Sequence, residues 1–363
     1  MFTVPTTMRA IVQGSDPPGK QILSTIAVPE PRPDEVLVRV HAVAINPCDW
    51  KMPSRFPTPG ASSGSDFAGV VVRLGSAVAA TPGLGIRVGD RVSSAVHGAN
   101  PVDPTTGSFA EYVCAVAALT WKVPSSMSFD DAAAIGGCGI GTAGLALFAP
   151  DTMGLRFEAE DDDYQLLDGP SSASAPRKPF VLVYGGSTAT GTMAIQLLKL
   201  HYGAEKVFDH RSPTCVADIK DYTRGTLRYV LDIITDARSV AVCEAVIGRG
   251  GGRYVGLEAL PEDVLAGKGV RSRSVKWNWV LGISLVGRGE ALEEPYRFEF
   301  NQERRDWGEN WFRHLVQDVV DRGLIKPHPP SVRPGGLASV PEGVQMLEKG
   351  QVRGEKLVYH IAD

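Results

Sequence analysis

One segment constrains the fold more than any other part of the chain. Residues 180–200 read FVLVYGGSTATGTMAIQLLKL, which is an apolar run, a turn of small residues and a helix-forming stretch. A buried strand that turns directly into a helix aims the N–H groups of the helix N-terminus at whatever lies beyond the strand, and these groups favour phosphate. The segment is typical of a dinucleotide-binding domain, and an ordinary strand-turn-helix connection is the alternative.

The turn departs from the glycine pattern G-x-G-x-x-G. Thr188, Ala189 and Thr190 occupy it, and only Gly191 of the later glycines is retained. The spacing by itself is therefore a weak signal. The hydroxyl groups of Ser187, Thr188 and Thr190 are candidates to donate to phosphate oxygens.

The residue pattern of the chain changes near residue 124. Before it, short apolar runs punctuated by Gly and Pro (RAIVQG, EVLVRVHAVAIN, DFAGVVVRLG, GDRVSSAV, FAEYVCAV) predict a β-barrel-type domain. After residue 180, strand and helix patterns alternate, which predicts a parallel sheet covered by helices. A length of 363 residues suits two domains. We expect the first at 1–130, the second at 131–320 and a C-terminal return to the first at 321–363.

The net charge and the cysteine content argue against several classes of protein. A net charge of -4 offers no basic field for nucleic acid. Five scattered cysteines suit a reducing compartment, with the cytoplasm as the default. The N-terminus lacks the pattern of a secretory signal. The uncharged run at 132–150 contains five glycines, so we interpret it as protein interior and expect no membrane attachment. Residues 156–179, acidic and then rich in Ser, Ala and Pro, resemble a solvated surface excursion.

A specific family resemblance runs through nearly the whole chain. HAVAINPCDWKM, SGSDFAGVVVRLGS, RVGDRV, GSFAEYV, GGSTATGT, IGRGGGRYVGL and GEKLV occur in the order seen in medium-chain reductases of the quinone reductase branch. The chain most resembles the trans-acting enoyl reductases that serve fungal highly reducing polyketide synthases. The resemblance implies an α/β protein with a GroES-like catalytic domain and a Rossmann domain that binds NADPH.

Zinc-dependent relatives place Cys, His and Glu at positions that here hold Asn46, Ser65 and Asp66. Cys48 lies next to Asp49, out of register for that ligand, and no closely spaced cysteine set is present. We therefore expect no metal.

The resemblance also implies site residues. Cofactor contacts would come from Cys48, Asp49, Trp50, Lys51, Ser187, Thr188, Ala189, Thr190, His210, Leu257, Glu258, Arg353 and Gly354. Substrate would lie along Thr142, Ala143, Gly144, Leu145, Ala146, Leu147, Phe148, Ala149 and Pro150, and along Ser284, Leu285, Val286, Gly287 and Arg288. Trp277 and Trp279 share one face of a predicted strand, and their nearness to Ser284 leaves a substrate-wall role open beside a core role.

Reduction of an enoyl thioester builds negative charge on the carbonyl oxygen, which a fixed donor stabilises. Lys51 and Thr142 are the candidates for this catalytic role. The alternatives are that Lys51 is a surface lysine and that Thr142 only starts a helix.

The function predicted from these features is NADPH-dependent enoyl reduction on a polyketide synthase carrier protein, with the synthase alone or fused to a nonribosomal peptide synthetase. We expect a monomer. A free quinone or alkenal oxidoreductase is the second hypothesis, because a fold does not fix a substrate. A cofactor-impaired binding or docking protein is the third.

The third hypothesis arises from a gap after Leu200. A six-stranded dinucleotide fold needs a further strand and helix there, and relatives carry roughly twenty more residues that read the 2′-phosphate of NADPH. We expect KVFDH, residues 206–210, to take the slot beside residues 180–184, with Asp209 near the ribose and His210, Arg211 and Ser212 as the local phosphate readers. Omitted coding sequence and a real deletion are both open, and we favour the first.

Overall fold

A computed structural model describes residues 3–81, 83–155, 158–160, 163–165, 179–203, 206–260, 274–289 and 291–361. The chain forms two compact units, one made of residues 1–141 and 283–363 and the other of residues 142–282. The C-terminal return to the first unit therefore begins near residue 283, earlier than the expected 321. The reason is that residues 302–321 pack with the first unit, where Gln317 bonds both the N–H and the carbonyl of Lys122.

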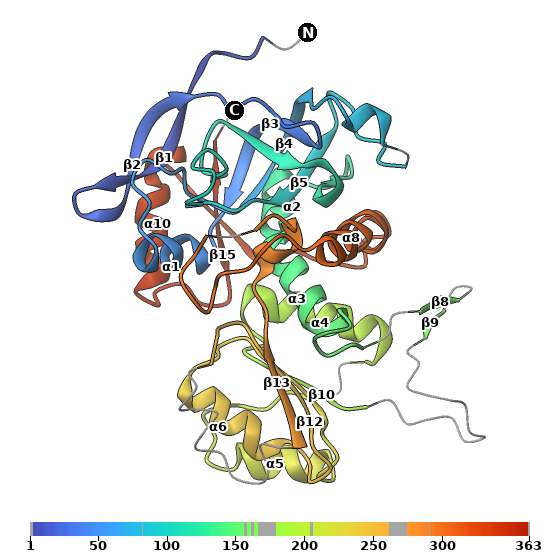
Figure 1. Cartoon of the computed structure of the whole chain (residues 1–363). Helices are drawn as coiled ribbons and strands as arrows, with labels where there is room; N and C mark the ends of the chain where they lie inside the picture. The colour runs from blue at the N-terminus through green and yellow to red at the C-terminus, as the bar shows by residue number, and fades with distance from the viewer. Residues whose placement is uncertain are drawn as a thin grey trace. The chain divides into compact units, whose positions relative to one another are not determined.

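The first unit is built on a mostly antiparallel seven-stranded sheet with the order β14-β15-β3-β4-β5-β7, in which β6 also pairs with β3. Figure 1 labels β3, β4, β5 and β15 of this sheet. Its strands are β3 (Glu35–Ala44), β4 (Asp66–Leu74), β5 (Arg91–Ala95), β6 (Tyr112–Val116), β7 (Trp121–Lys122), β14 (Pro330–Arg333) and β15 (Lys356–His360). A separate pair, β1 (Thr7–Ser15) and β2 (Pro18–Ala27), makes single bridges to Ala110 and Ser62. The predicted barrel-type domain is confirmed.

Apolar residues at alternate strand positions fill this unit. Val36, Val38 and Val40 of β3 face one core together with Phe67, Val71 and other buried side chains, as a period of two requires. The helices of the unit are α1 (Cys48–Arg55), α2 (Phe129–Ile135), α8 (Gln302–Asn310), a π-helical turn (Trp311–Val316), α9 (Gln317–Asp321) and α10 (Val340–Glu348), with short 3₁₀ turns at Val78–Ala80, Ala117–Leu119 and Gly336–Ser339. α3 (Cys138–Phe148) crosses the boundary between the units, and the 3₁₀ turn Gly282–Val286 lies at the second boundary.

The second unit holds a parallel sheet with the order β10-β11-β12-β13. Its elements are the short antiparallel pair β8 (Glu158–Glu160) and β9 (Asp163–Gln165), then β10 (Val181–Tyr184), α4 (Ala189–His201), α5 (Cys215–Tyr222), β11 (Tyr229–Asp232), α6 (Ala237–Val246), β12 (Gly252–Gly256) and β13 (Val275–Trp279). α4 packs on β10, and α5 packs with α6 beside the sheet (Figure 1). The predicted alternation of strand and helix is confirmed. The remainder of the acidic excursion lies outside the described residues.

The expectation for KVFDH is wrong. Residues 206–209 form no strand, and among the described strands β10 pairs with β11 alone. In a strand beside β10, Val207 and Phe208 would point to opposite faces of the sheet, so both faces would need other side chains packed against them. Phe208 finds a ring partner in Tyr222, at 5.9 Å between centroids, but Val207 is 93% exposed. The segment therefore runs beside the sheet on side-chain contacts instead of a hydrogen-bond ladder.

Candidate active site

The turn between β10 and α4 is closed by its own side chain. Thr188 is the N-cap of α4: its Oγ1 accepts from the N–H of Gly191 at 3.1 Å and donates to the carbonyl of Gly185 at 2.8 Å. The hydroxyl expected to donate to phosphate is thus already used in holding the turn. The N-terminus of α4 remains the group in this turn that suits an anion.

Two glycines make the turn tight. Gly185 has φ +88°, a left-handed conformation that favours glycine, and a Cβ on Gly191 would overlap the Gly185 carbonyl oxygen. Because neither glycine carries a side chain, a ligand can approach the backbone at the start of α4. The turn therefore fits the phosphates of a dinucleotide even though it lacks the usual glycine spacing.

The other candidate cofactor residues of this unit gather at the same edge of the sheet. Leu257 and Glu258 follow β12, and the N–H of Leu257 bonds Thr235 Oγ1 at 2.9 Å after β11. Because β10, β11 and β12 are parallel, all three turns meet at one carboxyl edge. Asp232, fully buried at the end of β11, fixes this edge by accepting from Ser239 Oγ at 2.6 Å and Tyr254 OH at 2.8 Å. Trp277 lies in β13 and is partly buried, with its ring 4.6 Å from the Tyr254 ring, which favours the core role over the substrate-wall role.

The candidate phosphate readers lie near the end of β10. The His210 ring is 5.9 Å from the Tyr184 ring, and its carbonyl accepts from Arg238 at 3.3 Å. Asp209 is exposed, and the Arg211 guanidinium that bonds it lowers its pKa to about 2. The carboxylate is therefore ionised and already paired with the arginine beside it.

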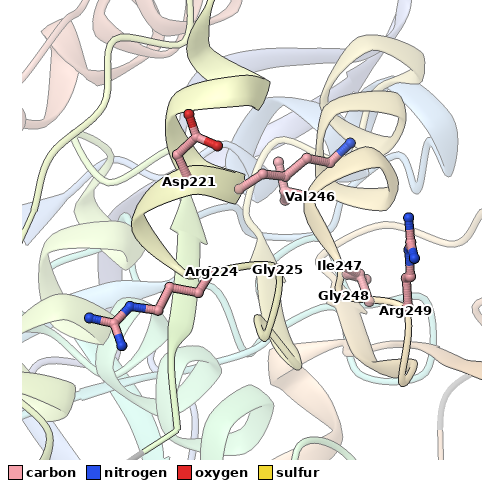
Figure 2. Close-up of a pocket in the computed structure, with 8 residues that line it drawn as sticks. Asp221, Arg224, Gly225, Val246, Ile247, Gly248 and Arg249 are labelled. Atoms are coloured by element: carbon pink, nitrogen blue, oxygen red, sulfur yellow. The ribbon is translucent and has the colours of Figure 1, made fainter.

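A cavity of about 460 Å³ lies elsewhere on this unit (Figure 2). It is lined by Lys220, Asp221, Arg224, Gly225, Val246, Ile247, Gly248 and Arg249. These residues precede β11 and β12, so the cavity opens at the amino edge of the sheet. Dinucleotides bind at the carboxyl edge of such sheets, and this cavity is therefore not the cofactor site.

In the first unit, Cys48–Lys51 form the first turn of α1. Lys51 Nζ lies 5.9 Å from the centroid of the Trp50 ring. Cys48 and Lys51 are three residues apart, so their side chains share one face of the helix. Arg353 and Gly354, at the other end of the chain, lie in the turn before β15, where Gly354 has φ +67°.

The centre of this unit is a buried carboxylate that the sequence did not reveal. Asp66, fully buried, accepts from Lys356 Nζ at 2.6 Å, from Asn46 Nδ2 at 2.8 Å, and from the backbone N–H groups of Gly137 and Cys138, each at 2.8 Å. Asp66 raises the pKa of Lys356 against the opposing effect of burial, so the lysine stays charged. No motif spacing connects residues 66 and 356, and only the antiparallel pairing of β15, β3 and β4 brings them together.

A second buried carboxyl group lies beside the first. Asp49 accepts from the N–H of Asn46 at 2.7 Å and from Ser65 Oγ at 2.8 Å. Ser65 Oγ in turn lies 3.3 Å from the Cys48 thiol. Burial raises the pKa of Asp49 to about 7, because its nearest donors are neutral while Lys356 bonds Asp66.

The candidate substrate residues are packed against protein. Thr142 is the fifth residue of α3, so it does not start that helix, and its hydroxyl lies against Gly282. Residues 142–149 are buried and Pro150 is exposed. In residues 284–288, Leu285 is buried and Arg288 bonds Glu35 at 2.6 Å and Asp34 at 2.9 Å. A substrate at Arg288 would therefore have to compete with two carboxylates.

The described part of the chain contains no group of three or more His, Cys, Asp or Glu side chains that could hold a metal ion. All five cysteines are free. One helical stretch in these residues, Phe129–Phe148, is long and apolar enough to cross a membrane, but 89% of its most apolar window is buried inside the protein, as in the core helix of a folded domain.

Comparison with known proteins identifies relatives over the whole length. Residues 32–125 match the alcohol dehydrogenase GroES-like domain. The trans-enoyl reductase mycC of Thermothelomyces thermophilus is 44% identical, with 99% of this chain and 98% of the relative aligned. The trans-enoyl reductase ccsC of Aspergillus clavatus is 43% identical, with 99% and 100% aligned. The first alignment spans 378 positions against the 363 residues of this chain, so at least 15 positions of that relative have no counterpart here.

Solved structures share the fold. A putative zinc-dependent alcohol dehydrogenase from Rhizobium etli matches with a TM-score of 0.74 at 20% identity, covering 99% of this chain and 100% of that one. The CurK enoyl reductase matches with a TM-score of 0.68 at 14% identity and the same coverage. Together with the relatives above, they show that this chain has the medium-chain reductase fold and belongs to the family of fungal trans-enoyl reductases.

Proposed function

We propose that the protein reduces α,β-unsaturated acyl thioesters held on the carrier protein of a highly reducing polyketide synthase, with NADPH as the reductant. The partner synthase stands alone or is fused to a peptide synthetase. The observation that carries the proposal is the full-length similarity to trans-enoyl reductases, together with a glycine-lined helix N-terminus at the carboxyl edge of a parallel sheet. The protein acts as a cytoplasmic monomer.

Each unit has a distinct part in this mechanism. The start of α4, with Ser187, Thr188, Ala189 and Thr190, binds the phosphates, and Leu257, Glu258 and His210 flank the same edge. NADPH supplies the hydride that adds to the β-carbon of the enoyl group. Lys51 of the first unit donates to the thioester oxygen while negative charge builds there, which lowers the barrier because the donor is already in place. Thr142 is the second donor, and Arg353 and Gly354 complete the cofactor contacts.

This function is tested by comparing the turnover of a pantetheine-linked enoyl thioester with the turnover of a free quinone at the same concentration. We expect the thioester to be reduced at least tenfold faster, by kcat/KM. Faster reduction of the quinone would favour a free quinone or alkenal oxidoreductase instead.

The shortened sheet supports one competing function, a docking protein with impaired cofactor binding. Titration with NADPH, followed by its fluorescence, separates the two. Saturable micromolar binding supports the reductase, and no binding up to millimolar NADPH supports the docking protein.

A further inference from the structure

The enoyl reduction proposed above needs a proton at the α-carbon, and the first unit holds a hydrogen-bonded chain suited to supply it. We propose that Cys48 donates this proton and that Ser65 and Asp49 replace it. The inference rests on the proposed function, because it names the proton source for that same reaction.

The chain runs from the interior to an accessible end. Asp49 is 4% exposed and Ser65 is 7% exposed, whereas Cys48 is partly exposed. The carboxyl oxygen and the hydroxyl are 2.8 Å apart, and the hydroxyl and the sulfur are 3.3 Å apart. Each of these groups both gives and accepts a proton, so the contacts form a continuous path.

The two buried carboxyl groups have different surroundings, which suits them to different tasks. Asp66 receives the Lys356 ammonium and three neutral donors, and these contacts fix the segment around Asn46. Asp49 has no ammonium in direct contact, and the charge of Asp66 opposes its ionisation while that of Lys356 favours it.

The thiol is suited to be the donor at the open end. The side-chain hydrogen bond with the neighbouring Cys138 thiol, burial and, to a smaller extent, the charge of Asp49 raise the pKa of Cys48, so it holds its proton at neutral pH. Cys48 lies one helical turn before Lys51 on the same face of α1. If Lys51 donates to the thioester oxygen, the α-carbon next to the thioester carbonyl can lie on the same face of α1, within reach of Cys48.

The proton balance is closed. As hydride forms the new C–H bond at the β-carbon, the C=C electron pair moves onto the α-carbon and the thioester oxygen. The Cys48 S–H bond then breaks as the α-carbon C–H bond forms. The thiolate takes the Ser65 hydroxyl proton, and Ser65 takes the Asp49 proton. After the product leaves, solvent returns one proton at Cys48, the accessible end, and the same chain carries it back to Asp49. One hydride and one proton are consumed for each double bond.

The test compares Cys48→Ala, Ser65→Ala and Asp49→Asn in the full chain with NADPH and an enoyl thioester. Cys48→Ala is expected to lower kcat about 100-fold, the lower end for loss of a general acid, with KM changed less than threefold. Since Asp49 must be protonated to resupply the thiol, wild-type kcat should fall as pH rises through about 7, and Ser65→Ala and Asp49→Asn should abolish that fall. The solvent deuterium isotope effect should increase in Ser65→Ala. Cys114→Ala, a thiol on β6 outside the chain, is the control and should keep wild-type kcat.

A second readout does not depend on turnover. Infrared difference spectra of the protein without cofactor should show a carboxyl band that titrates near pH 7 and is missing in Asp49→Asn. If folded Cys48→Ala and Ser65→Ala keep the wild-type kcat, pH profile and isotope effect, the proposed proton path is overturned. The proposal of enoyl reduction is unaffected by that result. Loss of thioester reduction in the wild type itself would instead overturn the proposed function.

Discussion

Buried charge is the dominant feature of the first unit at the scale of single residues. Lys356 and Asp66 are 3% and 0% exposed, and removing one member of such a pair leaves the other charge without its partner in the interior. The pair also ties the start of β15 to the start of β4 and, through two N–H groups, to the start of α3. Its role is therefore to hold together segments that are far apart in sequence.

Lys356→Met should lower the free energy of unfolding by about 3–5 kcal/mol, the usual cost of breaking a buried pair. Lys349→Met, at an exposed lysine, is the control and should change it by less than about 0.5 kcal/mol. Urea denaturation measures both. In the double variant with Asp66→Asn, part of the loss should be recovered because no unpaired carboxylate remains. A loss below about 1 kcal/mol in Lys356→Met would contradict this role.

Lys51 is a candidate that the sequence identified, and it lies half-buried in the first turn of α1. Lys51→Ala should lower kcat for an enoyl thioester about tenfold or more, the scale of losing one donor to a developing charge. Lys20→Ala, a lysine on β2, is the matched control. Steady-state kinetics on folded protein decide the matter, and an unchanged kcat would remove Lys51 from the mechanism.

At the scale of elements, the sequence predicted what periodicity and turn chemistry encode. β3, β4 and α4 lie where their apolar patterns place them. β2 was missed because its side chains are mostly exposed, so PGKQILSTIA carries no core-facing pattern, and it is a strand because it pairs with β1. The Asp66–Lys356 pair was also missed, because long-range pairing of strands produces no local signal.

The turn before α4 depends on the absence of a side chain at Gly191. In Gly191→Ala the new methyl group meets the Gly185 carbonyl oxygen, so the turn must open. Such overpacking costs about 1–3 kcal/mol, and NADPH affinity should fall about tenfold. Gly250→Ala, where a Cβ meets nothing within 4 Å, is the control and should bind as the wild type does. Fluorescence titration measures both affinities, and equal values would exclude this turn from the cofactor site.

At the scale of the whole molecule, the positions of zinc ligands in zinc-dependent relatives hold a different chemistry. Asn46 donates to Asp66, and both accept from the Lys356 ammonium, which supplies the positive charge that Asp66 requires. Ser65 donates to Asp49 instead. Purified protein should therefore contain less than about 0.1 zinc per chain by elemental analysis. Treatment with a chelator should leave thioester reduction unchanged. One tightly bound zinc per chain, lost together with activity, would contradict the prediction.

In the described part of the chain, the parallel sheet has four strands against the six of a full dinucleotide fold, and this has a measurable cost. β10, a central strand in a six-stranded dinucleotide fold, has only half-buried side chains, and β11 is its one partner among the described strands. Covering Val181, Leu182 and Val183 fully would contribute about 1 kcal/mol each. At least 15 positions of one relative have no counterpart here, and our expectation is that they lie after Leu200.

Inserting the corresponding segment of a relative between Gly203 and Lys206 should therefore raise the Tm of the second unit and tighten NADPH binding. A Gly/Ser insert of equal length is the control and should do neither, because it adds no strand and no apolar cover. Calorimetry and fluorescence titration measure the two effects, and transcript sequencing across residues 200–204 shows whether coding sequence was omitted. The contradicting outcome is a continuous transcript whose product binds NADPH as tightly as the insertion variant does. A four-stranded sheet would then be sufficient for cofactor binding, because β10 would need no second partner strand.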